Sequence, residues 1–331
     1  MAQRLTANEI GTLWTQNSQA SMSVQILRYF IETVEDEEIK RVIEQALNVS
    51  IQAQEQTNQL MQAYSIPVPV GFTDQDVDIT APKLFSDSLM LQFIENMGKA
   101  GLLSYSVSLA SCSNKEVRTL FNELLNETSQ FFNISLDTAL SNGSFLSPPQ
   151  IEINQDIEFV QSIKYFSPFH KRTVNTIETT HLFENIKSNT VGELLCTGFA
   201  QTTKCNKVKK FMTEGRDISK KHIQTFTKIF NESDIHPPMS ASYYVTQSTT
   251  PVFSDKMLVY FISVLTNTGQ GNYSIASSAS LRYDLVLLYQ KLSVEIGLYA
   301  KKGLDLMIYK NWLEEPPQLV DRDKLIDCSK G

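Results

Sequence analysis

Apolar residues recur every three or four positions through the first 150 residues, which is the spacing of an amphipathic α-helix. Four such stripes cover residues 6–34, 35–64, 86–112 and 113–140. The second stripe begins with four acidic residues, and carboxylates in a first helical turn interact favourably with the helix dipole. The pattern therefore predicts four long helices in the N-terminal half of the chain.

Proline and small polar residues mark the ends of these helices. Pro67 and Pro69 stop the second helix, because proline lacks an amide hydrogen and disfavours a helical residue before it. Ser86 is expected to cap the third helix, and either Ser113 or Asn114 the fourth. Tight turns join helices one and two and helices three and four, so each pair is antiparallel. The longer segment between helices two and three can cross the length of a bundle.

The same pattern occurs twice in the chain. Residues of the first half match residues 169 positions later, and the offset becomes 168 after one deletion near Lys83. The matches include Glu9 with Glu178, Leu13 with Leu182, Pro69 with Pro238, Phe85 with Phe253, Gly101 with Gly269, Tyr105 with Tyr273 and Leu136 with Leu304. An offset this constant indicates a tandem duplication.

The duplication sets the expected domain organisation. We expect a first four-helix bundle at residues 1–150, a linker at 151–172, a second four-helix bundle at 173–318 and a C-terminal tail at 319–331. The predicted fold class is all-α: two tandem ferritin-like up-down four-helix bundles, each with a long crossover from its second helix to its third. The aromatic residues of the linker are expected to pack between the bundles, with an exposed docking strip as the alternative; they are Phe159, Tyr165, Phe166 and Phe169.

Composition and charge describe an ordinary globular protein with two unlike halves. Hydrophobic residues make up 42% of the 331 positions, and the mean hydropathy is -0.18. The net charge of -7 is uneven, because only 9 of the 29 Lys and Arg residues lie in the first 168 positions. Opposite charges either help the halves dock or present different faces to partners. Neither a signal peptide nor a membrane span is expected, which favours a cytoplasmic protein.

Recognisable catalytic motifs are missing from the sequence. We find no GxSxG, no Walker loop, no GxGxxG after a strand and no CxxC. The four cysteines lack metal-ligand or redox spacing, so free thiols are expected; they are Cys112, Cys196, Cys205 and Cys328. The sequence therefore predicts no catalytic residue, no cofactor and no enzymatic activity.

A metal site is the chemistry that a ferritin-like bundle raises first. The usual pair of metals needs Glu from two helices and Glu-x-x-His from the other two. Residues 1–168 contain no histidine, and Glu127 is the only acid on the inner stripe of the fourth helix. In the second bundle Glu193, His222 and Glu295 fall near mid-height of three helices. They are candidate ligands of a degenerate single-metal site that favours zinc or iron; the alternative is a structural contact between a buried acid and a histidine.

Two other polar features have simpler interpretations. Glu178-x-x-His181 lies at the start of a helix, which favours helix capping over metal binding. A basic run follows the second helix of the second bundle, and a solvated helix face explains it best. An acidic protein partner, such as the first bundle of another copy, is the alternative, and nucleic acid is not expected. The run is Lys204, Lys207, Lys209, Lys210, Arg216, Lys220, Lys221 and Lys228.

The tandem pattern resembles an uncharacterised family from endospore-forming bacteria that is similar to spore coat protein F-like proteins. The resemblance rests on Leu13-Trp14 and Leu182-Phe183, the proline-rich crossover that leads into Phe-Ser-Asp, the Gly…Tyr-Ser of the third helix and the closing Pro-Pro-Gln. It covers the chain from about Leu5 to Gln318. It implies a spore-associated or stress-associated structural protein that is made in the cytoplasm, with deposition on the spore as one location, and it carries over no catalytic residue.

Three functional hypotheses follow. The favoured one is a non-enzymatic structural or interaction protein with protein partners or self-association. The second is a metal-binding bundle that uses Glu193, His222 and Glu295. The third is a carrier that holds an apolar small molecule in the Gly- and Ser-lined space beside the third helix, and it requires a sizeable pocket there. The sequence alone identifies neither a partner nor a ligand.

Overall fold

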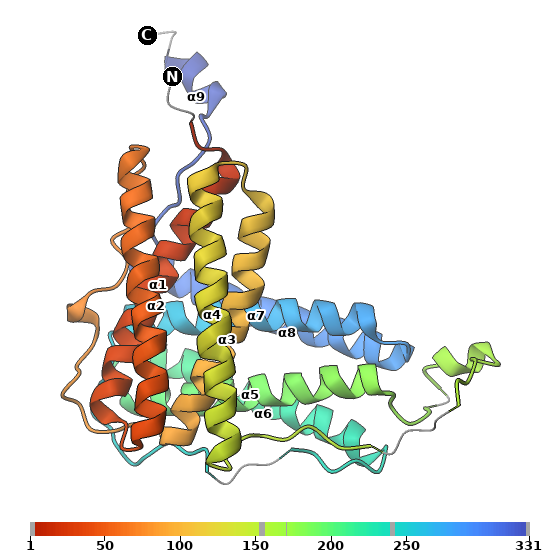
Figure 1. Cartoon of the computed structure of the whole chain (residues 1–331). Coiled ribbons are helices and arrows are strands. Elements are labelled where there is room, and N and C mark those ends of the chain that lie inside the picture. The colour runs from red at the N-terminus through yellow and green to blue at the C-terminus, as the bar shows by residue number, and fades with distance from the viewer. Residues whose placement is uncertain (1–3, 152–155, 170, 239–241, 329–331) are drawn as a thin grey trace.

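The computed structural model describes residues 4–151, 156–169, 171–238 and 242–328. These residues fold into long helices that form two tandem four-helix bundles, which confirms the predicted all-α class (Figure 1). Bundle one consists of α1 (Ala7–Thr33), α2 (Glu37–Ala63), α3 (Asp87–Ser111) and α4 (Lys115–Ser141). Bundle two consists of α5 (Thr176–Thr202), α6 (Asn206–Asn231), α7 (Asp255–Ala279) and α8 (Tyr283–Tyr309).

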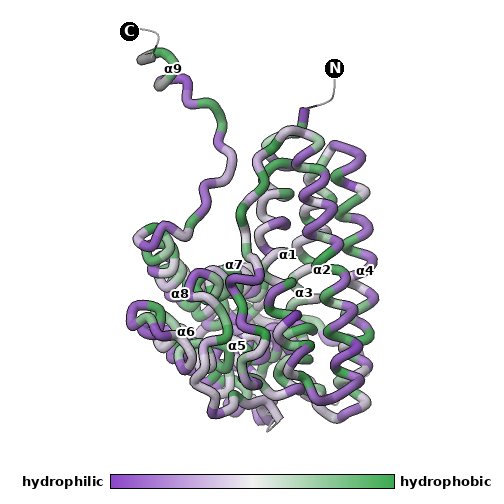
Figure 2. The backbone as a smooth tube through the Cα atoms, turned by 90° about the vertical axis from the view of Figure 1, so that its left-hand side faces the viewer, coloured by the Kyte–Doolittle hydropathy of each residue, from purple (hydrophilic) through white to green (hydrophobic). Residues whose placement is uncertain are grey.

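Short helical turns occupy the segments between and after the bundles. The 3₁₀ turn η1 (Asp74–Asp76) lies in the first crossover, and η2 (Ile163–Phe166) lies in the linker. The tail contains α9 (Arg322–Cys328), which stands away from both bundles (Figure 2). The long helices begin and end within a few residues of their predicted bounds, because their caps are local features of the sequence.

The expected helix caps are present. The Ser86 hydroxyl accepts a hydrogen bond from the Leu89 amide at 3.3 Å and caps α3. For α4 the structure selects Asn114 over Ser113, since the Asn114 side chain accepts from the amides of Glu116 and Val117. These bonds satisfy backbone donors that a helix start leaves without partners inside the helix.

A buried glutamate at the start of each first helix ties that helix to a distant turn. In bundle one a Glu9 oxygen accepts from the Ser113 and Asn114 amides at 2.8 and 2.6 Å. Burial opposes ionisation of Glu9, but hydrogen bonds from the amides of Thr6 and Asn114 and from side-chain hydroxyls outweigh it and lower its pKa to about 2. Glu178 repeats the arrangement in bundle two by accepting from the Leu281 and Arg282 amides.

The two bundles meet crosswise and share one hydrophobic core. Figure 1 shows α5–α8 running across the lower half of α1–α4. The largest cluster of buried apolar residues continues from one bundle to the other, including Phe30 and Phe93 of bundle one and Phe199 and Phe261 of bundle two. Separate clusters fill the far end of each bundle. The bundles are therefore packed together rather than linked as independent beads.

The two crossover segments also pair with each other in a reciprocal way. Val77 bridges to Phe253, and Phe85 bridges to Val245, each in antiparallel fashion. Backbone amides donate across both junctions, for example from Asp78 to Val252 at 2.7 Å and from Thr246 to Leu84 at 2.9 Å. Each half thus contributes the same stretch of its crossover, as in a two-fold interface between identical subunits.

A buried ion pair joins α3 to α5 where the bundles meet. Lys187 of α5 contacts Glu95 of α3, and their side chains are 5% and 12% exposed. The Gln92 amide donates to the other Glu95 oxygen at 3.2 Å, and the Tyr243 hydroxyl donates to Gln92 at 2.9 Å. Such a pair is costly to bury, and its hydrogen bonds offset part of that cost. It connects the second crossover, α3 and α5 in one polar network.

The linker differs from expectation. Phe159 and Phe169 are 79% and 90% exposed, so the prediction that they pack between the bundles is wrong. Tyr165 and Phe166 are half-buried, and the Tyr165 ring contacts Phe166 and the guanidinium of Arg172. The contacts of Tyr165 are therefore made within the linker and its continuation to α5, rather than between the bundles.

Two further expectations concern the cysteines and the membrane. Cys112, Cys196 and Cys205 are free thiols, and the side chain of Cys328 lies outside the described part of the chain. Within the described ranges, no helix combines the length and the apolar character needed to cross a bilayer. The uncharged stretch from 257 to 281 forms most of α7 and the turn after it.

Candidate functional site

The structure brings together two of the three candidate metal ligands. His222 is fully buried, and its Nε2 lies 3.2 Å from a carboxylate oxygen of Glu295. Glu193 is apart from this pair, and the charges that act on it are those of Arg216, Lys220 and Asp217. Burial raises the pKa of Glu193, against the effect of the two cations. Among the described residues, no group of three His, Cys, Asp or Glu side chains is close enough to hold a metal ion.

His222 instead belongs to a chain of hydrogen bonds that runs from the surface into bundle two. The Lys221 ammonium donates to Glu295 at 2.7 Å, and His222 Nδ1 lies 2.8 Å from the Tyr273 hydroxyl. The Asn189 side chain donates to the same hydroxyl at 2.9 Å. Every polar group of this chain therefore has a partner, which matches the structural alternative for the histidine.

The environment of these hydrogen bonds also determines the protonation state of His222. Burial lowers the pKa of His222, and the hydrogen bond and charge of Glu295 oppose that effect only partly. The ring is therefore neutral at pH 7 and carries one hydrogen. Because the ionised Glu295 accepts only, that hydrogen sits on Nε2, and Nδ1 accepts from Tyr273. Tyr273 thus donates to the histidine and accepts from Asn189.

Bundle one lacks the histidine at the equivalent place. Ala53 stands where bundle two has His222, while Tyr105 and Glu127 repeat Tyr273 and Glu295. The Tyr105 hydroxyl accepts from the Gln16 amide at 3.1 Å. One oxygen of Glu127 is buried and has no hydrogen-bond partner within the described residues. The two bundles therefore share the tyrosine and the glutamate but not the group that connects them.

The structure agrees with the simpler interpretations of the Glu-x-x-His pair and of the basic run. Glu178 forms a capping box with Asn175 at the start of α5, so the Glu-x-x-His pair begins a helix. Burial raises the pKa of Glu178, but hydrogen bonds from Arg172 and from the backbone outweigh it and lower the pKa. Most of the basic run on α6 is exposed, and Lys221 within it pairs with Glu295.

A large cavity lies where the two bundles meet. Its volume is about 690 Å³, which is within the range of ligand pockets in proteins. The middle sections of α3 and α7 form much of the wall, and α1 and α5 contribute as well. Equivalent residues of the two halves line it, namely Phe93 and Phe261, Tyr105 and Tyr273, Gly101 and Gly269, Phe131 and Tyr299. The duplication has therefore produced a cavity with two-fold character.

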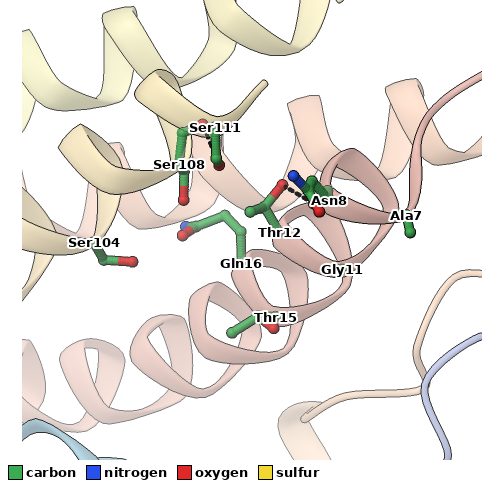
Figure 3. Close-up of a pocket in the computed structure, with 9 residues that line it drawn as sticks. All are labelled: Ala7, Asn8, Gly11, Thr12, Thr15, Gln16, Ser104, Ser108 and Ser111. Atoms are coloured by element: carbon green, nitrogen blue, oxygen red, sulfur yellow. Dashed lines mark hydrogen bonds between the residues drawn. The ribbon is translucent and has the colours of Figure 1, made fainter. Parts of the chain in front are cut away.

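A smaller polar pocket adjoins this cavity between α1 and α3. Its volume is about 550 Å³, and Figure 3 shows side chains of both helices around it, from Gly11 and Thr12 to Ser111. Gln16, Ser104 and Ser108 line both the pocket and the cavity. The apolar chamber between the bundles therefore continues into a hydroxyl- and amide-lined mouth at the surface of bundle one.

The outer face of α8 is unexpectedly apolar. Four large side chains on it are between 57% and 64% exposed, and their helical spacing places them on one face. We call this set the α8 stripe; it consists of Tyr283, Leu287, Val294 and Leu298. The equivalent exposed positions of α4 are all polar, namely Lys115, Thr119, Asn126 and Gln130. The stripe was not predicted from the sequence, because α8 is apolar on its inner face too and its pattern does not show which residues face outward.

The comparison with protein families agrees with the duplication. The family described as "Protein of unknown function (DUF3231)" matches twice, over residues 1–157 and 166–325. No curated protein matches the chain significantly. A solved structure described as a "putative spore coat protein" of Bacillus halodurans is similar at 21% sequence identity, with a TM-score of 0.42. The similarity covers 46% of this chain and 98% of that protein.

Proposed function

Because this chain belongs to the DUF3231 family, whose function is unknown, we propose its role from its own structure: a non-enzymatic interaction protein that assembles through the α8 stripe. The observation that carries the proposal is the difference between α8 and α4. The two helices occupy the same place in the duplicated unit, but Leu287 and Leu298 are exposed on α8 where α4 has Thr119 and Gln130. Exposed apolar patches on a helix face are typical of protein contact sites.

The partner we propose is bundle one of a second copy. Bundle two carries the exposed lysines of α6 beside the stripe, whereas the first 168 residues hold 20 of the 36 acidic residues and few basic ones. Opposite charges favour contact between unlike bundles over contact between two α8 faces. Such a head-to-tail contact repeats along a growing assembly unless its rotation closes a ring. An extended assembly suits a protein that builds a layer.

We place this assembly at the spore. The support is the resemblance of the repeated motifs to spore coat protein F-like proteins, which implies synthesis in the cytoplasm followed by deposition on the spore. The absence of an enzymatic role is part of the same proposal. It is supported by the use of the buried acids Glu9 and Glu178 in helix caps and of the partly exposed Glu295 in an ion pair.

Sedimentation velocity tests the assembly directly. We expect the intact chain to associate more as its concentration rises, and less as added salt screens the charges. The double variant Leu287→Gln, Leu298→Gln should stay monomeric, because it removes the apolar centre of the contact. The matched control Thr119→Gln, Asn126→Gln alters the equivalent face of α4 and should associate like the unmodified chain.

Two outcomes would overturn assembly through the α8 stripe, and a third would overturn its proposed partner. A chain that remains monomeric at high micromolar concentration and low salt does not self-assemble. Association that is unchanged in the α8 double variant uses another surface. If the chain associates only into closed dimers whose stability is insensitive to salt, the stripe is a contact site but the charge-guided contact with bundle one is wrong.

A further inference from the structure

The cavity between the bundles is shaped by residues that keep it open. Gly101 and Gly269 occupy equivalent positions on its wall, and a Cβ atom at Gly269 would touch only Ile296, at 3.6 Å. The space in front of Gly269 is therefore free for a larger side chain. A packed interior leaves few voids larger than a water molecule, so an opening of about 690 Å³ is large for a core junction.

The lining of the cavity restricts the charge of a ligand. Lys99 is the only charged residue among the described residues that line it, and Lys99 is already paired with Glu184 of α5. The remaining wall consists of aromatic and aliphatic side chains with hydroxyl and amide groups between them. A buried charge without a partner costs far more than a buried neutral group. An occupant of this chamber is therefore uncharged.

Polar groups collect at one end of the cavity. Gln16, Ser104 and Ser108 form the shared boundary with the polar pocket on bundle one. Beside them the Tyr105 hydroxyl accepts from Gln16, and its hydrogen remains available to an acceptor on a ligand. The equivalent Tyr273 differs, because it already donates to His222 and accepts from Asn189. The hydrogen-bonding end of the site is therefore on the side of bundle one.

We infer that the inter-bundle cavity binds an uncharged amphiphile, with an apolar body between α3 and α7 and a hydroxyl-type end group at Gln16, Ser104 and Tyr105. This binding site is separate from the α8 stripe, which lies on the outer face of bundle two. The inference does not depend on assembly of the protein. It also specifies the chemical class of the ligand for the third functional hypothesis, which places a small molecule beside the third helix.

A matched pair of probes tests the class of ligand. Dodecan-1-ol and dodecanoate have the same chain length, but only the second is charged at pH 7. We expect the alcohol to displace Nile red from the full-length protein and to raise its Tm by about 5 °C near saturation. The carboxylate should bind at least about ten-fold more weakly, because the chamber offers it no free cation.

A cavity-filling variant tests the location. Gly269→Leu should weaken binding of Nile red and of the alcohol by about ten-fold or more, since its side chain enters the chamber. Ser278→Leu introduces the same side chain on the exposed face of α7 outside the cavity, and it should bind like the unmodified protein. Circular dichroism confirms that both variants are folded before binding is compared.

Three results would overturn the inference. If neither probe displaces Nile red, the cavity is not a ligand site of this kind. Equal binding of the alcohol and the carboxylate would refute the uncharged class. Full binding in a folded Gly269→Leu variant would place the site elsewhere on the molecule. All three measurements can be made on a monomeric α8 variant, which separates them from a failure of self-assembly.

Discussion

Bundle one and bundle two repeat the same backbone but differ in their buried polar groups. His222 of α6 corresponds to Ala53 of α2, and Lys187 of α5 corresponds to Ser18 of α1. Both residues of bundle two are buried and hydrogen-bonded. By contrast, the capping glutamates at the start of α1 and α5 are the same in both halves.

The difference shows which polar groups the fold requires and which it has added. The capping glutamate satisfies backbone amides at a turn that every copy of the bundle must make, so it is present in both. Lys187 lies at the contact between bundles, and the His222 chain ends at the cavity wall. Lys187 and the hydrogen-bond network of His222 are therefore additions of bundle two that reach the junction of the two halves.

The largest expected effect concerns the ion pair between the bundles. Lys187→Met leaves Glu95 buried without its cation and should lower the free energy of unfolding by about 3–5 kcal/mol. Ser18→Ala, at the equivalent position of bundle one, should change it by less than about 1 kcal/mol. Urea denaturation followed by circular dichroism measures both changes.

The double variant Lys187→Met, Glu95→Leu provides the control for this prediction. It removes both charges and should recover most of the loss, because no unpaired buried charge remains. An equal loss in the single and the double variant would mean that packing, rather than charge, matters at this contact.

A smaller effect distinguishes the two equivalent glutamates. Glu295→Gln weakens the bonds from Lys221 and His222 and should cost about 1–2 kcal/mol of stability. Glu127→Gln should be neutral or stabilising by up to about 1 kcal/mol, because one oxygen of Glu127 is buried without a partner. Thermal unfolding of both variants measures these changes in stability. If Glu127→Gln lost more stability than Glu295→Gln, the Glu127 side chain would have hydrogen-bond partners despite Ala53 at the position of the histidine.

The smallest expected effect is a pH dependence of the free energy of unfolding that arises from His222 in bundle two. Burial lowers the pKa of His222 below its ordinary value of 6.5, so in the window just below 6.5 the unfolded chain binds a proton there that the folded chain does not. The free energy of unfolding should therefore fall as the pH falls through this window. In His222→Gln, urea midpoints between pH 7 and pH 5 should fall less steeply than in the unmodified chain.

Two other titratable groups, His181 and Glu9, also affect how the stability of the protein changes with pH. Burial and the charge of Lys99 also lower the pKa of His181, so His181→Gln is the matched control and should remove only its own share of the slope. Glu9, with a pKa of about 2, contributes stability that is lost only below its ordinary value of 4.5. An unchanged slope in His222→Gln would contradict the assignment of a neutral buried ring.

The helices and their repetition could be predicted from the sequence because their signals are local. Caps such as Ser86 and apolar stripes depend on residues a few positions apart, and the constant offset exposes the duplication. The meeting of His222 with Glu295 was also foreseeable, since both lie at mid-height on inner stripes. The structure does not bring Glu193 to this pair, and position along a helix does not reveal which neighbouring side chain a residue faces.

Features that depend on contacts between the bundles could not be read from the pattern. The cavity requires α3 and α7 to be held apart, and only the richness of α3 in Gly and Ser pointed towards it. The α8 stripe was hidden because Leu285 and Leu287 look alike in sequence, yet one is buried and the other is exposed. The pairing of the two crossovers joins residues far apart in the chain, which no local signal records.

That pairing has a consequence for how the protein is made. The Tyr29 ring packs on Phe253 with centroids 5.4 Å apart, and Phe93 packs on Phe261 at 5.5 Å, so residues of the second half complete the interior of the first. Chains are synthesised from the N-terminus, and contacts between distant positions form late in folding. Bundle one therefore leaves the ribosome before the side chains that finish its interior exist, and its apolar end faces solvent or a chaperone until α7 has been translated.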